Sequence, residues 1–160
     1  MTREQFIQHI ESEQASLRRF LLALCCGNRA EADDIAQEAL IKAYLSIAHY
    51  RDEGKFNAWL YRIAHNTFLD RCKSQPTHTS LDEAASLPDP TFNSDRNYQY
   101  QELYQAIATL PPKERTAILL YYLNGYTIKE ISHIINCNQN AVKKQLSRGR
   151  EQLKIKITQQ

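Results

Sequence analysis

The chain has 160 residues, enough for one domain or two small ones, with 42% hydrophobic and 24% charged residues and a net charge of +2. Only 4 glycines and 5 prolines occur, which favours an all-α fold over a sheet. The sequence contains no run of about 18 apolar residues, the length needed to span a membrane. The N-terminus carries acids and lacks the apolar core of a signal peptide. We therefore expect a cytoplasmic protein without membrane insertion.

The first informative element is a helix predicted over residues 31–50, EADDIAQEALIKAYLSIAHY. One face carries an apolar stripe at helical spacing, which comprises Ala32, Ala36, Ala39, Leu40, Ala43 and Ile47. The opposite face carries Asp34 and Glu38, followed by the apolar Ile41 and Leu45. Apolar side chains on an outer face suggest a protein partner. The alternative, which spacing leaves open, is that Ile41 and Leu45 pack against the first helix near residues 20–24.

The loop YRDEGK leads into a second helix that is predicted to begin near residue 56. Polar and aromatic side chains gather within one arc of this helix: Lys55, Trp59, Arg62, Asn66 and Lys73. An indole, an amide and several cations suit single-stranded nucleic acid, whose bases stack on aromatic rings and whose phosphates attract cations. A buried Trp59 beside cations that extend along the surface is the alternative.

Residues 74–95, SQPTHTSLDEAASLPDPTFNSD, contain three prolines, many polar residues and little periodic apolar content. This composition predicts a flexible linker. The linker would divide the chain into an N-terminal lobe, residues 1–73, and a C-terminal lobe, residues 96–160. Each lobe has the length of a small helical domain.

In the C-terminal lobe a helix predicted over about 95–109 is followed by a helix that begins at Pro112 and ends before Asn124-Gly125. Thr127 and a glutamate three residues later form the capping box of a short third helix, and Asn138 caps a longer fourth one. Two helices joined by a turn of three or four residues make the helix-turn-helix pattern.

The last predicted helix has an apolar spine and a basic outer face. The spine comprises Val142, Leu146, Gly149, Leu153 and Ile157. Residues 101–160 hold nine Lys and Arg against four acids, so positive charge gathers in this lobe. The second helix of a helix-turn-helix enters the major groove, where Asn140 and Lys144 could reach base edges while Arg148 could contact phosphate. An ordinary basic surface helix is the alternative.

The chain combines, in this order, a lobe suited to unpaired bases, a linker and a helix-turn-helix. In this combination it resembles the extracytoplasmic-function (ECF) sigma factors, the smallest sigma-70-type initiation factors. In that family region 2 carries segments like ADDIAQEALIKAY and FNAWLYRIAHNTFLDRCK, and region 4 carries one like LPPKERTAILLYYLNGYTIKEISHIINCNQNAVKKQLSRGREQLK. The resemblance covers nearly the whole chain. It implies an alternative initiation factor that directs core RNA polymerase to specific promoters.

The resemblance implies three sites by position in these motifs. The site for the clamp helices of the polymerase β′ subunit comprises Asp34, Gln37, Glu38 and Ile41. The site that opens the −10 element and holds a flipped base comprises the loop 50–56, which includes Lys55, together with Trp59, Arg62 and Asn66. The site that contacts the −35 element comprises Lys143, Lys144, Gln145 and Arg148. The family also implies an anti-sigma factor that clamps both lobes.

Two other classes of protein predict different features. An ordinary helix-turn-helix transcriptional regulator with an N-terminal sensing lobe would form a homodimer that reads paired half-sites. An enzyme of nucleic-acid processing would need a cluster of carboxylate, His or Cys side chains. The four cysteines form no CxxC pair and the five histidines are scattered, so the sequence predicts no metal site, no cofactor and no enzymatic activity.

Overall fold

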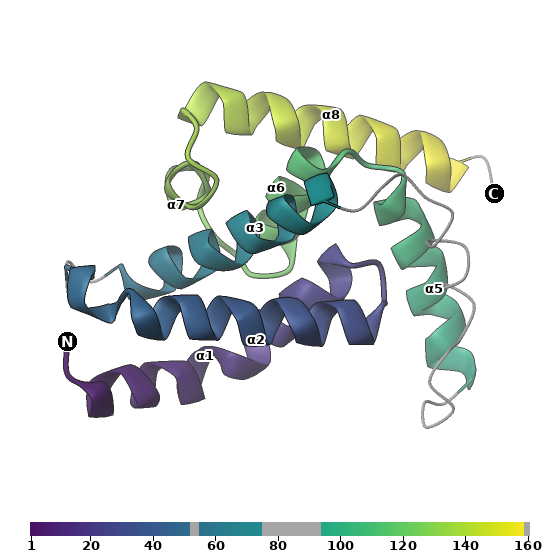
Figure 1. The fold of residues 1–160 in the computed structure, drawn as a ribbon. Coiled ribbons are helices and arrows are strands. Elements are labelled where there is room, and N and C mark those ends of the chain that lie inside the picture. The colour runs from purple at the N-terminus through teal and green to yellow at the C-terminus, as the bar shows by residue number, and fades with distance from the viewer. Residues whose placement is uncertain (52–54, 75–93, 159–160) are drawn as a thin grey trace.

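The computed structural model describes residues 1–51, 55–74 and 94–158, with the side chains of residues 101–156 in the last range. Within these ranges every regular element is a helix, as the composition predicts. Figure 1 shows α1 (Arg3–Leu24) and α2 (Arg29–Leu45) on one side, α3 (Phe56–Ser74) in the middle and α8 (Gln139–Thr158) on the other side. The predicted linker, 74–95, lies outside the described residues except at its two ends.

In the N-terminal lobe, capped helices pack through small side chains. Thr2 and Gln5 form a capping box at the start of α1, and the side chain of Asn28 accepts a hydrogen bond from the third residue of α2. Alanines on the inner face of α2 are buried and let α1 and α3 approach closely: Ala32, Ala36, Ala39 and Ala43. The predicted helix 31–50 is too long, because α2 ends at Leu45 and a short 3-10 turn, η1 (Ile47–His49), follows.

The C-terminal lobe contains α5 (Ser94–Ala108), α6 (Pro112–Tyr122), α7 (Ile128–Ile134) and α8. Its turns have the predicted chemistry. Gly125 has φ 73° and Asn136 has φ 56°, the left-handed conformation that these residues tolerate. Thr127 closes the capping box of α7, and Asn138 Oδ1 accepts the Ala141 N–H at 2.7 Å. The helix-turn-helix of α7 and α8 is therefore confirmed, with a turn over residues 135–138.

The predicted apolar spine of α8 faces the lobe interior. Val142, Leu146 and Gly149 are buried and Leu153 is half-buried, while the Ile157 side chain lies outside those described. Gly149 lies against α6, where a Cβ at this position would be 2.6 Å from Ile118 Cγ1. No ordinary carbon contact is that short. Glycine is therefore required here for the close approach of α8 to α6.

The two lobes are packed together, a feature that the sequence did not predict. α3 contacts α7 and α1 contacts α6, and one continuous hydrophobic cluster includes core residues of both lobes. Figure 1 shows α3 lying between the two groups of helices. The predicted nucleic-acid side chains stay outside this core, because Asn66 and Lys144 are exposed and Trp59 is half-buried.

Replacement of Gly149 by alanine should lower the free energy of unfolding by about 1 kcal/mol. Overpacking costs about 1–3 kcal/mol, and the better helix propensity of alanine offsets about 0.5–1 kcal/mol of that. Chemical denaturation measures the change. Ser147→Ala, on the exposed face of α8, is the control and should not destabilise the protein. The cost of Gly149→Ala should fall in an Ile118→Ala background; an equal cost in both backgrounds would contradict the contact.

Candidate functional site

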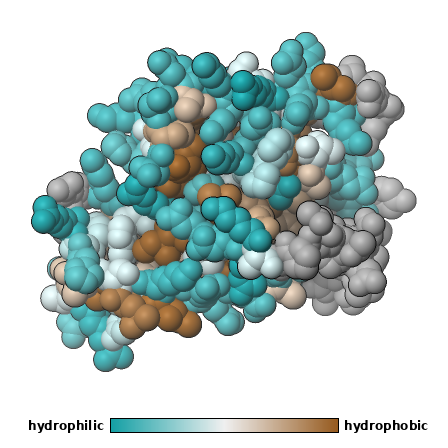
Figure 2. Space-filling view, turned by 45° about the horizontal axis from the view of Figure 1, so that its top comes forward, coloured by the Kyte–Doolittle hydropathy of each residue, from teal (hydrophilic) through white to brown (hydrophobic). Residues whose placement is uncertain are grey.

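An apolar surface lies on the outer face of α2, toward its C-terminal end. Ile41 is 59% exposed, Tyr44 46% and Leu45 73%. The alternative that Ile41 and Leu45 pack against α1 is therefore not what the structure shows. Figure 2 shows that apolar side chains interrupt a mostly hydrophilic face in separate patches. Exposed apolar side chains gathered on one helix are typical of a surface that binds another protein.

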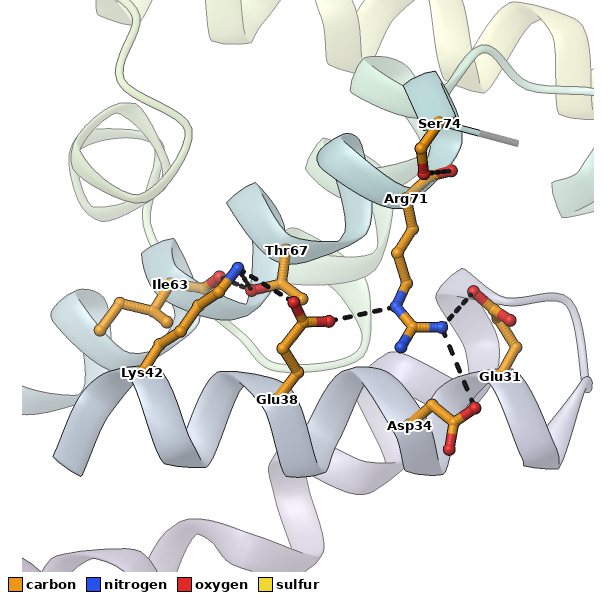
Figure 3. Close-up of polar contacts among 8 residues, drawn as sticks. All are labelled: Glu31, Asp34, Glu38, Lys42, Ile63, Thr67, Arg71 and Ser74. Atoms are coloured by element: carbon orange, nitrogen blue, oxygen red, sulfur yellow. Dashed lines mark hydrogen bonds and ion pairs between the residues drawn. The ribbon is translucent and has the colours of Figure 1, made fainter. Parts of the chain in front are cut away.

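The predicted acidic side chains of α2 lie beside this apolar surface and are held by α3. Arg71 Nε is 3.2 Å from Glu38 Oε2, and Arg71 Nη1 is 3.2 Å from Glu31 Oε1 and 4.0 Å from Asp34 Oδ2. Lys42 Nζ lies 3.4 Å from Glu38 Oε1 and also donates to Thr67 Oγ1. Figure 3 shows Arg71 extending from α3 across the acidic row of α2.

This ion-pair network lowers the pKa of Glu38, chiefly through the hydrogen bond from Arg71. The Glu38 side chain is still 42% exposed, so water screens the pair and its effect on stability is small. Gln37 is exposed on the same helix. The network therefore fixes the orientation of the acidic side chains that a partner would meet.

The predicted strip on α3 divides into an aromatic part and a polar part. The Trp59 ring packs on Tyr50 with ring centroids 4.8 Å apart and on Phe56 with centroids 5.6 Å apart. Trp59 is thus partly structural, as the alternative interpretation held, and partly exposed. Lys55 is exposed just before α3, and Arg62 and Asn66 are exposed one turn apart on the helix. Residues 52–54 of the preceding loop lie outside the described part.

The predicted residues of α8 do not all face the same way. Asn140, Lys143, Lys144 and Arg148 are exposed. Gln145 is half-buried, and its Oε1 is turned into the junction between the lobes with no hydrogen-bond partner among the described residues. Arg150 Nε donates to Tyr122 OH at 2.6 Å and lies over the rings of both tyrosines at the end of α6, so its orientation is set by α6.

Sequence reasoning missed several residues of these surfaces. Tyr44 stands three positions after Ile41, so helical periodicity could have placed it on the apolar surface. Arg71 gave no local signal, because its partners lie on another helix. Lys42 stands four positions after Glu38, so helical spacing could have found that ion pair, but not the bond from Lys42 to Thr67 on α3. Within residues 1–51, 55–74 and 94–158, no group of three His, Cys, Asp or Glu side chains could hold a metal ion, and no helix is long and apolar enough to cross a membrane.

Comparison with protein families gives two matches that follow one another along the chain. Residues 9–76 match Sigma-70 region 2, and residues 100–153 match Sigma-70, region 4. The ECF RNA polymerase sigma factor SigW of Bacillus subtilis is 35% identical over 145 residues, which cover 82% of this chain and 78% of SigW. The sigma factor SigM of the same organism is 32% identical over 142 residues, which cover 85% of each chain.

Solved structures share the fold over almost the full length. The sigma factor RpoE in complex with the anti-sigma factor NepR from Bartonella quintana matches with a TM-score of 0.76 and 21% identity, over 97% of this chain and 98% of RpoE. CnrH in complex with the cytosolic domain of CnrY matches with a TM-score of 0.76 and 16% identity, over 98% of this chain and 90% of CnrH. The family matches and the similarity to SigW do not favour the regulator with a sensing lobe.

Replacement of Arg71 by methionine should raise the pKa of Glu38 toward its ordinary value of about 4.3, with Lys42 still lowering it. Because the pKa is lowered in the folded protein, the pair stabilises the fold above the ordinary carboxyl pKa, and this stabilisation is lost as the pH falls through the lowered value. An NMR titration of side-chain carboxyl groups measures the pKa. Arg62→Met, an exposed arginine on the same helix, should leave it unchanged; an equal shift in both variants would refute the assignment.

Proposed function

The chain belongs to the ECF family of RNA polymerase sigma factors, and we propose that its two lobes divide the recognition of a promoter between them. It is an alternative sigma-type transcription initiation factor. In this proposal residues 1–73 bind core polymerase and open the −10 element, residues 74–95 connect the lobes, and residues 96–160 read the −35 element. The matched ranges, 9–76 and 100–153, support these boundaries.

The observation that carries the proposal is the set of exposed side chains that one chain presents on three helices. α2 presents an apolar surface beside fixed acids, α3 presents Arg62 and Asn66, and α8 presents lysines on the second helix of a helix-turn-helix. Each helix suits a different ligand: protein, unpaired bases and duplex DNA.

The α8 surface supports recognition of the −35 element. Asn140, Lys143 and Lys144 lie on the first turns of α8, the part of a recognition helix that reaches base edges in the major groove. Arg148 follows one turn later and can neutralise a phosphate. Gln145 would have to leave the junction between the lobes before it could contact DNA.

The α3 surface supports opening of the −10 element. Unstacking a base step costs a few kcal/mol, and contacts to an extruded base can offset that cost. Asn66 can donate and accept hydrogen bonds to a base edge, and Arg62 can stack on a base or pair with phosphate. Trp59, supported by Tyr50 and Phe56, supplies an aromatic edge beside them.

The α2 surface supports docking on the clamp helices of the polymerase β′ subunit, with Ile41 as its apolar contact and Asp34, Gln37 and Glu38 beside it. We further propose that an anti-sigma factor regulates the chain, since the similar structures RpoE and CnrH are complexes with NepR and CnrY. The family relatives are transcription factors, and we propose that this chain likewise has no enzymatic activity and acts in the cytoplasm, where polymerase transcribes.

In vitro transcription tests the proposal directly. Purified chain and core polymerase are incubated with a DNA library whose −35 and −10 positions are randomised, and the transcribed templates are sequenced. Two enriched motifs at a fixed spacing are expected only when both proteins are present. Transcription that does not depend on the chain, or templates without common motifs, would refute the proposed function.

Ile41→Glu should weaken binding to core polymerase at least about tenfold, because a carboxylate would be buried in an apolar interface. The fold should be retained, since the side chain is 59% exposed. Fluorescence anisotropy measures the affinity and circular dichroism the helix content. Leu103→Glu, an exposed leucine on α5, is the matched control. Equal weakening by both variants would remove Ile41 from the docking surface.

Lys144→Ala should weaken binding of the holoenzyme to a promoter by about 1–3 kcal/mol if the lysine reads a base, without changing the affinity for core polymerase. If the lysine contacts phosphate alone, binding should fall similarly on all sequences and the salt dependence should decrease by about one unit. Arg3→Ala, which removes one positive charge from the first turn of α1, is the control. Unchanged promoter binding in Lys144→Ala would contradict the assignment.

A further inference from the structure

A ring of hydrogen bonds joins the two lobes at the end of α6. Asn124 Nδ2 donates to Ser16 Oγ at 3.1 Å and to Tyr61 OH at 3.0 Å, and these two hydroxyl oxygens are 2.9 Å apart. Ser16 and Tyr61 belong to the N-terminal lobe, and Asn124 to the C-terminal lobe. Tyr61 is completely buried, and the Tyr126 ring packs edge-on against it with centroids 5.4 Å apart.

A second polar contact joins α6 to the end of α1. Arg115 Nη1 donates to the Leu24 carbonyl at 3.0 Å, and Arg115 Nη2 donates to the Leu110 carbonyl at 3.1 Å. The last turn of α1 has no basic residue of its own. Carbonyl groups at a helix C-terminus lack partners within the helix and attract cations. Arg115 therefore supplies from one lobe the positive charge that the helix end in the other lobe requires.

The junction also contains a small cavity. It has a volume of about 100 Å³ and is lined by His65 and Leu69 of α3 and by Lys113, Cys137 and Gln145 of the other lobe. This volume holds a few water molecules and is well below that of a ligand pocket. The cavity is therefore part of the junction between the lobes, and not a small-molecule site.

The closed arrangement cannot satisfy both promoter elements at once. A packed chain of 160 residues has a radius of gyration of about 15 Å, so it measures about 40 Å across. The −10 and −35 elements are separated by about 25 base pairs, or about 85 Å at 3.4 Å per base pair. The 19 residues of 75–93, between the end of α3 and the start of α5, can span at most about 65 Å, which together with the lobes themselves reaches that separation.

We propose that the contacts of Tyr61, Asn124 and Arg115 form a latch that holds the free chain closed, and that the latch must break before both lobes engage one promoter. The requirement for opening rests on the proposed function, because it follows from the distance between the elements. The latch leaves Asn66 and the first two lysines of α8 exposed. It holds the α3 and α8 surfaces too close together to reach both promoter elements, and it keeps Gln145 inside the junction. Opening is thus the step that a polymerase would drive.

Small-angle X-ray scattering of the full chain tests the latch without polymerase or promoter. The wild type should have a radius of gyration of about 15 Å, and Tyr61→Phe/Arg115→Met should exceed it clearly, above about 20 Å, with unchanged helix content. Loss of the two contacts should lower the ratio of closed to open molecules about a hundredfold. The matched control is Tyr122→Phe/Arg150→Met, which removes a tyrosine–arginine hydrogen bond within the C-terminal lobe.

A second variant guards against misfolding. Asn124→Ala removes only the amide that donates to both hydroxyl groups, and should lower the ratio about fivefold to tenfold. Its affinity for core polymerase should rise by up to the same factor, because fewer molecules must be opened on binding. A wild type that is already extended, or a double variant as compact as the control, overturns the latch. Either result leaves transcription by the chain untouched, so the two proposals fail separately.

The pH dependence of opening gives an independent readout. The groups that face His65 from the other lobe are Lys113 on α6, the Cys137 thiol after α7 and the uncharged Gln145 on α8. Burial, with a smaller effect of Lys113, lowers the pKa of His65 to about 4, while a histidine in an open molecule has about 6.5. The open form therefore takes up a proton first as the pH falls, and closing should weaken between pH 7.5 and 5, by at most about thirtyfold. In His65→Gln this dependence should disappear; an unchanged dependence would contradict the burial of His65 by the junction between the lobes.

Discussion

A tyrosine hydroxyl buried between two helical bodies must find hydrogen-bond partners, because an unpaired buried hydroxyl costs free energy on the scale of a whole hydrogen bond. In this chain Tyr61 finds one partner in its own lobe and one in the other lobe. That constraint fixes the end of α6 against α1 and α3, and with it the position of the helix-turn-helix that follows. The rest of the junction is apolar packing and one arginine at a helix end, both of which tolerate small displacements more easily than a closed ring of three polar groups does.

The local architecture of each lobe could be predicted because its signals lie within a few residues of one another. The capping box of Thr127, the cap of Asn138 and the left-handed Gly125 each stop or start a helix through contacts no more than four residues away. The same holds for the buried alanines of α2 and the spine of α8, which follow from the period of a helix. The boundary at Ser46 was missed, since no glycine or proline marks it.

The arrangement of the lobes could not be predicted, because each contact that fixes it joins residues far apart in the chain. Asn124 reads in the sequence only as part of an Asn-Gly helix stop, and its side chain nevertheless bonds to Ser16, 108 positions away. Arg115 resembles any first-turn arginine, although it serves the end of α1, and Arg71 resembles any surface cation, although it orders the acids of α2. For the same reason the sequence misplaces Gln145. Its position in the motif predicts a contact with DNA, whereas its side chain lies in the junction between the lobes.

Helix α3 links the −10 surface, the acids of α2 and the junction with the C-terminal lobe. No single sequence motif reveals that one helix makes all three contacts. One side of α3 carries Arg62 and Asn66 to the solvent, another sends Arg71 to the acids of α2, and a third places Tyr61 and His65 against the C-terminal lobe. Neutral hydrogen bonds contribute only about 1 kcal/mol each in net terms, so the polar contacts of the latch add a few kcal/mol to the apolar packing of the junction. A protein interface of ordinary size is stabilised by several times that amount. A large partner that binds both α2 and the C-terminal lobe can therefore separate the lobes without unfolding either one. This requires that its two binding sites lie farther apart than the two surfaces lie in the closed chain.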